Sequence, residues 1–226
     1  DKQAILQEAV NEETASFTEV NDEGVYKLQA SAVCIDNETG RVVAIVGGRE
    51  QEYVGYTLNR AYQSFRQPGS SVKPLIIYTP WFERGLTPDT LLLDAKFEGG
   101  PKNSGSYLGE ITARTAVEKS QNTIAWKLFT ELTPETGLEY LKRMNFRRIV
   151  DSDYVPAASL GGLTYGASAL EMASAYAALE NDGIFRNPTC IVQITDIDGN
   201  RFIDYMCAYG PNILGYNDPD VDAAAA

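Results

Sequence analysis

Ser70 and Lys73 stand three positions apart directly after a Pro-Gly pair, in a segment that predicts a turn leading into a helix. Residues three apart share one face of a helix, so we expect the hydroxyl and the amine side by side at its positively polarised start. The apolar residues that follow predict that the helix continues, with a kink at Pro80 and an end at Gly85.

The chemistry open to this pair follows from the absence of histidine among the 226 residues. That absence excludes a Ser-His-Asp triad, a Cys-His pair and any histidine-ligated metal. A nucleophilic serine would need a carboxylate or a lysine as its base, and lysine accepts a proton only when burial or a nearby cation keeps it neutral. The spacing alone also fits a structural interpretation, in which Ser70 caps the helix and Lys73 is a solvated side chain.

Composition restricts the classes of partner and cofactor. A hydrophobic fraction of 44% is typical of a globular protein, and a net charge of -12 argues against nucleic acid or an anionic membrane surface as a partner. Cys34, Cys190 and Cys207 form no C-x-x-C pair, so no zinc site or other cofactor is expected. Apolar flanks predict that Cys34 and Cys190 are buried free thiols, and a disulfide between any two cysteines stays open.

The order of predicted elements indicates an α+β domain. Asn122 is expected to be the N-cap of a helix, and a capping box begins another at Ser168. The strands are predicted at 28–36, 41–46 and 189–197, the first two as a hairpin, and the helices at 1–14, 111–119, 123–132, 133–145 and 168–180, with loops at 86–109 and 150–167.

Several stretches together resemble one known family. Residues 66–74 read Arg-Gln-Pro-Gly-Ser-Ser-Val-Lys-Pro, which resembles the active-site serine motif of penicillin-binding proteins, in particular the transpeptidase domain of the bifunctional class A enzymes. Ser120-Gln121-Asn122 resembles the S-x-N motif of that family. Agreement extends from about residue 28 to residue 199 and includes Asn59-Arg60-Ala61, Pro101-Lys102-Asn103, the Leu-Gly-Gly-Leu-Thr-Tyr-Gly of 160–166 and the helix at 168–180.

The resemblance implies both a fold and a reaction. The fold would be a central antiparallel sheet with a mainly helical subdomain. Ser70 would attack the D-Ala-D-Ala carbonyl of a peptidoglycan stem peptide, Lys73 would take the serine proton, Ser120 would relay a proton and Asn122 would hold the substrate amide. The implied partners are peptidoglycan stem peptides and β-lactam antibiotics, with no nucleic acid and no metal.

The resemblance also implies a larger parent protein. The chain begins at Asp1, so we expect a piece of a membrane-anchored protein at the extracellular face of a bacterial cell membrane, with a glycosyltransferase domain upstream and the piece itself soluble. We divide the chain into a lead-in with a linker helix (1–27), a transpeptidase domain (28–222) and an uninformative alanine tail (223–226).

One motif of the family is missing. None of the eight lysines precedes Thr-Gly or Ser-Gly, so the K-T-G strand that walls the active site is absent. We expect a deletion or an omission between Ile203 and Asp204, which leaves the sheet incomplete around that strand. In the family this strand supplies an oxyanion donor, and loss of one such donor costs about 10²–10³ in rate in a comparable acyl transfer enzyme.

Two other functions compete with a transpeptidase. A class A β-lactamase is disfavoured because Gln121 replaces the aspartate of S-D-N and no E-x-x-L-N deacylation motif is present. A catalytically inactive module that binds cell-wall peptide or a partner protein is favoured by the missing K-T-G. It is opposed by the intact Ser70–Lys73 pair and S-x-N turn.

Overall fold

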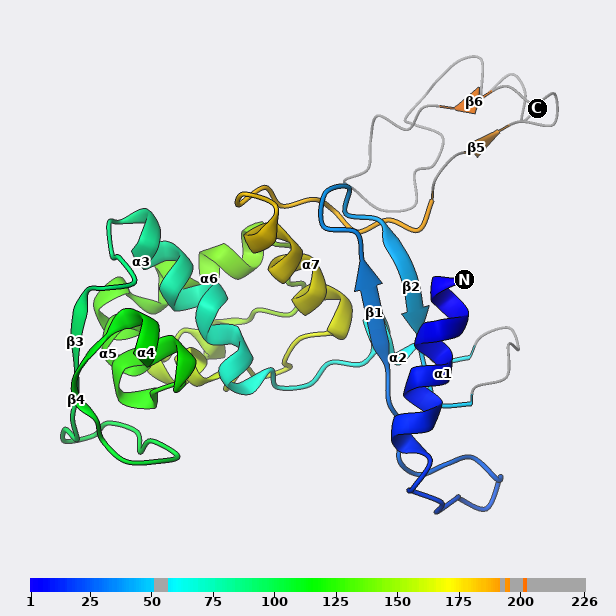
Figure 1. The fold of residues 1–226 in the computed structure, drawn as a ribbon, viewed down its shortest axis with the longest axis horizontal. Helices are drawn as coiled ribbons and strands as arrows, with labels where there is room; N and C mark the ends of the chain where they lie inside the picture. Colours follow the sequence, from blue (N-terminus) through cyan, green and yellow to red (C-terminus); the bar gives the residue numbers. More distant parts are fainter. Residues whose placement is uncertain (51–56, 192–193, 196–200, 203–226) are drawn as a thin grey trace.

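The computed structural model describes residues 1–50, 57–191, 194–195 and 201–202, which form an α+β fold, as predicted (Figure 1). The helices are α1 (Lys2–Thr14), α2 (Arg60–Gln63), α3 (Thr79–Glu83), α4 (Ala113–Glu118), α5 (Asn122–Leu132), α6 (Pro134–Arg143) and α7 (Ala169–Glu180). Shorter helical turns are η1 (Gly69–Val72), η2 (Pro74–Tyr78), η3 (Asp151–Asp153) and η4 (Pro156–Leu160). The strands are β1 (Ala32–Ile35), β2 (Val42–Val46), β3 (Leu91–Asp94), β4 (Gly109–Thr112), β5 (Ile194–Thr195) and β6 (Arg201–Phe202).

The strands pair as three separate antiparallel hairpins, β1–β2, β3–β4 and β5–β6. The β1–β2 hairpin was predicted, and its turn is closed by Asp36, whose carboxylate accepts the Thr39 N–H at 2.9 Å. In the described part of the chain the predicted sheet is represented by the β1–β2 hairpin, and Thr189, from the predicted strand at 189–197, forms a parallel bridge with Arg41 beside β2. A hairpin forms from local contacts, whereas further strands must come from distant sequence. The expected junction at Ile203–Asp204 lies outside the described residues.

The main core surrounds η2, directly after the Ser70–Lys73 segment. Leu75, Ile76 and Ile77 are fully buried there against α5 and α6. The close approach of α6 requires Gly137, since an added Cβ would lie 2.4 Å from the Phe129 ring and 2.8 Å from the Ile76 carbonyl oxygen. The first helical segment is therefore anchored by the apolar residues that follow Lys73.

The helical run from Gly69 to Glu83 changes type twice instead of forming one α-helix. The Thr79 N–H donates five residues back to Pro74, and its hydroxyl also donates to that carbonyl at 2.8 Å. Pro80 follows and has no N–H to offer to Ile76, which accounts for a π-helical turn just before it. The irregularity predicted at Pro80 takes this form, and the helix ends before Gly85 at φ +100°, as predicted.

The β1–β2 hairpin lies between two helices (Figure 1). On one side α7 packs against β1. On the other, α1 covers the outer edge of β2, where the Gln3 side chain donates to the Ile45 carbonyl at 2.9 Å and accepts the Ile45 N–H at 2.9 Å. Edge groups of β2 are thus paired by a side-chain amide. Within the described ranges, every helix is too short or too polar to cross a lipid bilayer.

Three local predictions were wrong. Ile111 belongs to β4 and not to a helix, because it pairs with Leu92 of β3, a strand inside the expected loop at 86–109. The apolar run at 91–93 was the overlooked signal. Cys34 and Cys190 are exposed free thiols and not buried ones, because no described element covers them; Cys207 lies outside the described residues.

Candidate active site

Ser70 lies in η1, at the N-terminal end of the helical run. It is exposed, and its Oγ forms no hydrogen bond with any described residue. The neighbouring Ser71 differs, since its hydroxyl donates to the Pro68 carbonyl at 2.7 Å. The alternative that Ser70 is a helix cap is therefore wrong, and its hydroxyl is free for another partner.

Lys73 follows one turn later, and its N–H donates to the Ser70 carbonyl. Its side chain is only 2% exposed. Nζ donates to the Asn122 Oδ1 at 2.7 Å, the Ser120 carbonyl at 2.7 Å and the Ser120 Oγ at 3.0 Å. The alternative of a solvated lysine is wrong, because the Lys73 amine is buried and hydrogen-bonded to Ser120 and Asn122.

The protonation state of Lys73 is set by its burial. Desolvation lowers the pKa of the ammonium from 10.5 to about 8. About one molecule in ten would then carry a neutral amine at pH 7. Of the three groups around Nζ, only the Ser120 hydroxyl can also act as a donor, since the other two are a carbonyl and an amide oxygen. The Lys73–Ser120 contact can therefore reverse direction when the lysine loses its proton.

Ser120 and Asn122 lie at the junction between α4 and α5. Ser120 adopts φ +52°, which ends α4 and turns its carbonyl and hydroxyl toward Lys73. Asn122 was predicted to be the N-cap of α5, but it is the first helical residue and Gln121 is the N-cap. Its side-chain oxygen is directed at Lys73, because its amide group donates to the Lys102 carbonyl at 2.8 Å.

The chain before Ser70 is held by the loop at 160–167. Arg66 and Ala167 exchange both backbone hydrogen bonds, at 3.0 Å and 2.8 Å. Gly161 has φ +79° and lies so close to Gly69 that an added Cβ would be 2.2 Å from the Gly69 carbonyl oxygen. Tyr176 of α7 also donates to the Ser71 carbonyl at 2.7 Å. These contacts position the serine segment, and sequence reasoning assigned them no role.

Sequence reasoning also missed a polar cluster beside Asn122. Asn103 accepts hydrogen bonds from the first N–H groups of α5. The buried Asp94 in turn accepts hydrogen bonds from the side chains of Asn103 and Thr123. The only signal was the position of Asn103 in the family-like Pro-Lys-Asn stretch. No sequence signal pointed to Asp94, because it is the last residue of a strand that was not predicted.

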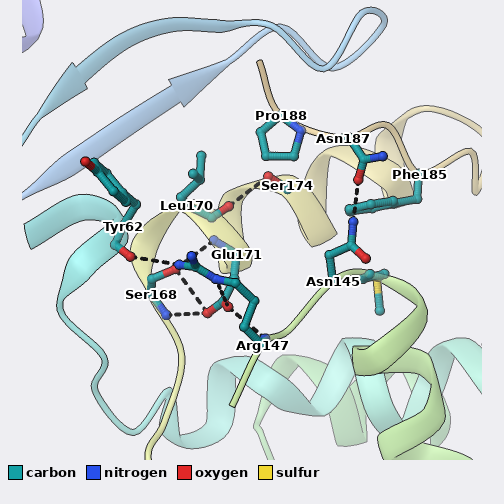
Figure 2. A pocket seen from close by; sticks show the side chains of 11 residues that line it. Tyr62, Asn145, Arg147, Ser168, Leu170, Glu171, Ser174, Phe185, Asn187 and Pro188 are labelled. Carbon is teal, nitrogen blue, oxygen red and sulfur yellow. Dashed lines mark hydrogen bonds and ion pairs between the residues drawn. The ribbon is translucent and has the colours of Figure 1, made fainter. Parts of the chain in front are cut away.

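A separate pocket of about 240 Å³ lies between the start of α7, the segment after α6 and residues 185–188 (Figure 2). None of the predicted site residues lines it. Its buried Glu171 accepts the Ser168 N–H at 2.8 Å and the Arg147 N–H at 3.0 Å, while Arg147 donates to the Tyr62 carbonyl at 2.9 Å. Glu171 and Arg147 are paired with each other, so these charges hold the surrounding segments together, and we assign the pocket a structural role. The predicted capping box of Ser168 and Glu171 forms part of it.

The fold and the site define an α+β domain with a Ser-x-x-Lys segment and a Ser-x-Asn turn around one buried amine. Residues 30–223 match the model of the penicillin binding protein transpeptidase domain. The chain therefore belongs to the penicillin-binding protein transpeptidase family, which confirms the resemblance inferred from its motifs.

Individual relatives agree with this assignment. Penicillin-binding protein 4 of Bacillus subtilis is 36% identical over 177 residues, covering 76% of this chain and 28% of that protein. Penicillin-binding protein 1F of the same organism is 40% identical over 182 residues, covering 78% and 25%. The chain thus spans about a quarter of the length of these relatives.

Solved structures show the same fold. The crystal structure of penicillin-binding protein 1A from Haemophilus influenzae matches with a TM-score of 0.63 and 32% identity, over 81% of this chain and 29% of that one. PonA1 from Mycobacterium tuberculosis, solved in complex with penicillin V, matches with a TM-score of 0.71 and 22% identity, over 90% and 56%. The second likeness supports the fold alone.

Proposed function

We propose that this chain is the serine acyltransferase part of a peptidoglycan D,D-transpeptidase, and that β-lactams acylate Ser70. The observation that carries the proposal is the buried amine of Lys73, 2% exposed and held on Ser120 and Asn122 one turn after an unpaired serine hydroxyl. A module that binds a ligand without catalysing a reaction has no need for a desolvated amine at this position.

The proposed reaction uses the groups in a fixed order. The neutral Lys73 amine accepts the proton as Ser70 Oγ attacks the carbonyl carbon of the penultimate D-Ala, forming a C–O bond and a tetrahedral oxyanion. The oxyanion collapses, the C–N bond to the terminal D-Ala breaks, and the leaving amine receives a proton through Lys73 and Ser120. An amine of a second stem peptide then attacks the acyl-serine and releases Ser70. With a β-lactam the same attack breaks the ring C–N bond and the nitrogen takes the proton, but this amine stays tethered to the acyl group through the rest of the molecule and does not leave.

Asn122 would act on both sides of this reaction. Its Oδ1 orients the Lys73 amine, and its Nδ2 donates to the Lys102 carbonyl. A substrate amide that displaced this contact would be held by Asn122 next to Ser70, in the role the family resemblance implies. The Ser70 N–H, which donates to no described residue, is available for the oxyanion.

The parent protein would be larger than this chain. The part that matches this chain is about a quarter of each relative's length, and the resemblance to the bifunctional class A enzymes implies a glycosyltransferase domain elsewhere in the parent. We infer a membrane-anchored parent with a glycosyltransferase domain, acting on stem peptides at the extracellular face of a bacterial membrane.

Labelling with a fluorescent penicillin tests the proposal, with Ser70→Ala and Ser71→Ala as a matched pair of neighbouring substitutions. We expect a covalent label on the wild-type chain and on Ser71→Ala, and none on Ser70→Ala. Peptide mapping should place the added mass on the segment that contains Ser70. Labelling of Ser70→Ala at the wild-type level would overturn the assignment of the nucleophile.

A second measurement separates an enzyme from an inactive module. Release of D-Ala from a stem-peptide analogue is expected if the chain turns over, and the missing K-T-G strand predicts a rate lower by about 10²–10³ than with a complete oxyanion hole. A chain that binds the analogue reversibly, with neither acylation nor D-Ala release, would be the inactive module.

A further inference from the structure

The first turn of α5, which carries Asn122, has no cap from its own sequence. Gln121 occupies the N-cap position, but its side chain makes no capping hydrogen bond. The acceptor comes instead from Asn103, whose Oδ1 accepts the Asn122 N–H at 2.8 Å and the Thr123 N–H at 3.2 Å. The first N–H groups of a helix have no intrahelical partner, so Asn103 fixes where α5 begins.

Asn103 is itself held by Asp94, the last residue of β3. The Asn103 amide group donates to Asp94 Oδ1 at 2.8 Å, which turns its oxygen toward α5. Asp94 is fully buried, and its carboxylate also accepts the Leu108 N–H at 2.8 Å and the Thr123 hydroxyl. Three donors thus surround a buried anion whose position is set by the β3–β4 hairpin.

The charge of Asp94 survives its burial. Desolvation raises the pKa of the carboxyl, but hydrogen bonds from Thr123, Asn103 and Leu108, together with the charge of Lys127, lower the pKa overall below its ordinary value. The group is therefore an ionised acceptor at neutral pH, and charge-assisted hydrogen bonds of this kind are shorter and stronger than neutral ones.

The same stretch of chain also fixes the side chain of Asn122. Its Nδ2 donates to the Lys102 carbonyl at 2.8 Å, which leaves Oδ1 2.7 Å from Lys73 Nζ. Residues 102 and 103 therefore hold both the backbone and the amide of Asn122. Without them, nothing described would prevent the amide from rotating its donor group toward the lysine.

We propose that Asp94, Asn103 and Thr123 form a positioning network that keeps Asn122 and Ser120 on the Lys73 amine. The inference rests on the acyl-serine reaction proposed above and adds to it three residues that touch no reacting atom. Their effect would pass through the start of α5 to the base. A misplacement of about 1 Å at such a group costs about 10² in rate.

Thr123 offers the sharpest test, because two substitutions separate its hydroxyl from its shape. Thr123→Val keeps the side-chain volume and removes the donor to Asp94, whereas Thr123→Ser keeps the donor and removes a methyl group. We expect Thr123→Val to slow acylation by a fluorescent penicillin about tenfold or more and Thr123→Ser to stay within about threefold of wild type. A purely structural role predicts instead that both rates follow the loss of melting temperature.

Asn103→Ala provides a second variant, with Thr133→Ala as its control. Thr133 caps α6 by accepting the Thr136 N–H at 3.4 Å, and its side chain forms no hydrogen bond with Lys73, Ser120 or Asn122. Both variants remove one capping acceptor from one helix. Only Asn103→Ala is expected to slow acylation by about tenfold or more.

The positioning network can also be tested by a measurement that needs no substrate. Titration of the ¹³C-labelled Lys73 side chain by NMR should show a midpoint that moves by at least about half a pH unit in Asn103→Ala and Thr123→Val, and stays in place in Thr123→Ser and Thr133→Ala. An unchanged Lys73 midpoint and an unchanged acylation rate in the first two variants would overturn the network. If the wild-type chain were never acylated, the proposed function would fail, and the titration alone would decide on the network.

Discussion

Lys73 Nζ lies 2.7 Å from Asn122 Oδ1, although 49 positions of sequence separate the two residues. The contact joins the segment of the proposed nucleophile to the first turn of α5. Together with the two contacts from Nζ to Ser120, it places a buried amine at the meeting point of two helical segments. The properties of that amine lead to the first two predictions.

Lys73→Arg is expected to abolish acylation even though the positive charge is kept. A guanidinium stays protonated at any accessible pH and cannot take the serine proton. Loss of a general base costs about 10²–10⁴ in rate. The acylation rate with a fluorescent penicillin measures the effect, with Lys96→Arg at an exposed lysine as the control. A wild-type rate in Lys73→Arg would remove Lys73 as the base.

The acylation rate should depend on pH through Lys73. Burial lowers the pKa of this group to about 8, and in the proposed mechanism only the neutral amine can accept the serine proton. The rate should therefore rise about tenfold per pH unit below that value and level off above it. Stopped-time labelling between pH 6 and 9 gives the profile. A rate that is constant over this range would show that proton transfer to Lys73 does not limit acylation.

Gly161→Ala should disturb the serine segment directly. The new Cβ would lie 2.2 Å from the Gly69 carbonyl oxygen, at a backbone φ of +79° that disfavours alanine. We expect a loss of about 1–3 kcal/mol in stability together with slower acylation.

Gly162→Ala is the matched control for this substitution. Its nearest contact would be 3.1 Å, to the Ala157 carbonyl oxygen, at an ordinary backbone conformation. Melting temperatures and labelling rates should separate the two variants. Equal effects in both would mean that the contact with Gly69 is not what positions Ser70.

Gly137→Ala should lower the stability of the helical core without touching the site residues. An added Cβ would be 2.4 Å from the Phe129 ring and 2.8 Å from the Ile76 carbonyl oxygen, so α6 must move away from η2. Overpacking of this kind costs about 1–3 kcal/mol. Denaturant unfolding measures it, with Gly105→Ala, where nothing lies within 4 Å, as the comparison. A stable Gly137→Ala protein would show that α6 tolerates the displacement.

The sequence alone determined those features that depend on neighbours along the chain. The Pro-Gly turn before Ser70, the end of the helix at Gly85, the capping box of Ser168 and Glu171, and the β1–β2 hairpin all follow from local conformational preferences. The chemistry of Ser70 and Lys73 followed from their spacing and from the lack of histidine. Family-like motifs then led to the fold class and the family.

Only the tertiary structure decided which groups surround the amine of Lys73. Burial, which sets its pKa, depends on η2 packing against α5 and α6 and cannot be read from residues 70–73. Asn122 looked like a cap from its local sequence, yet Asn103 supplies that acceptor from 19 positions earlier, because the β3–β4 hairpin brings it there. Because this long-range hydrogen bond from Asn103 caps α5, the Asn122 side chain is available to contact Lys73.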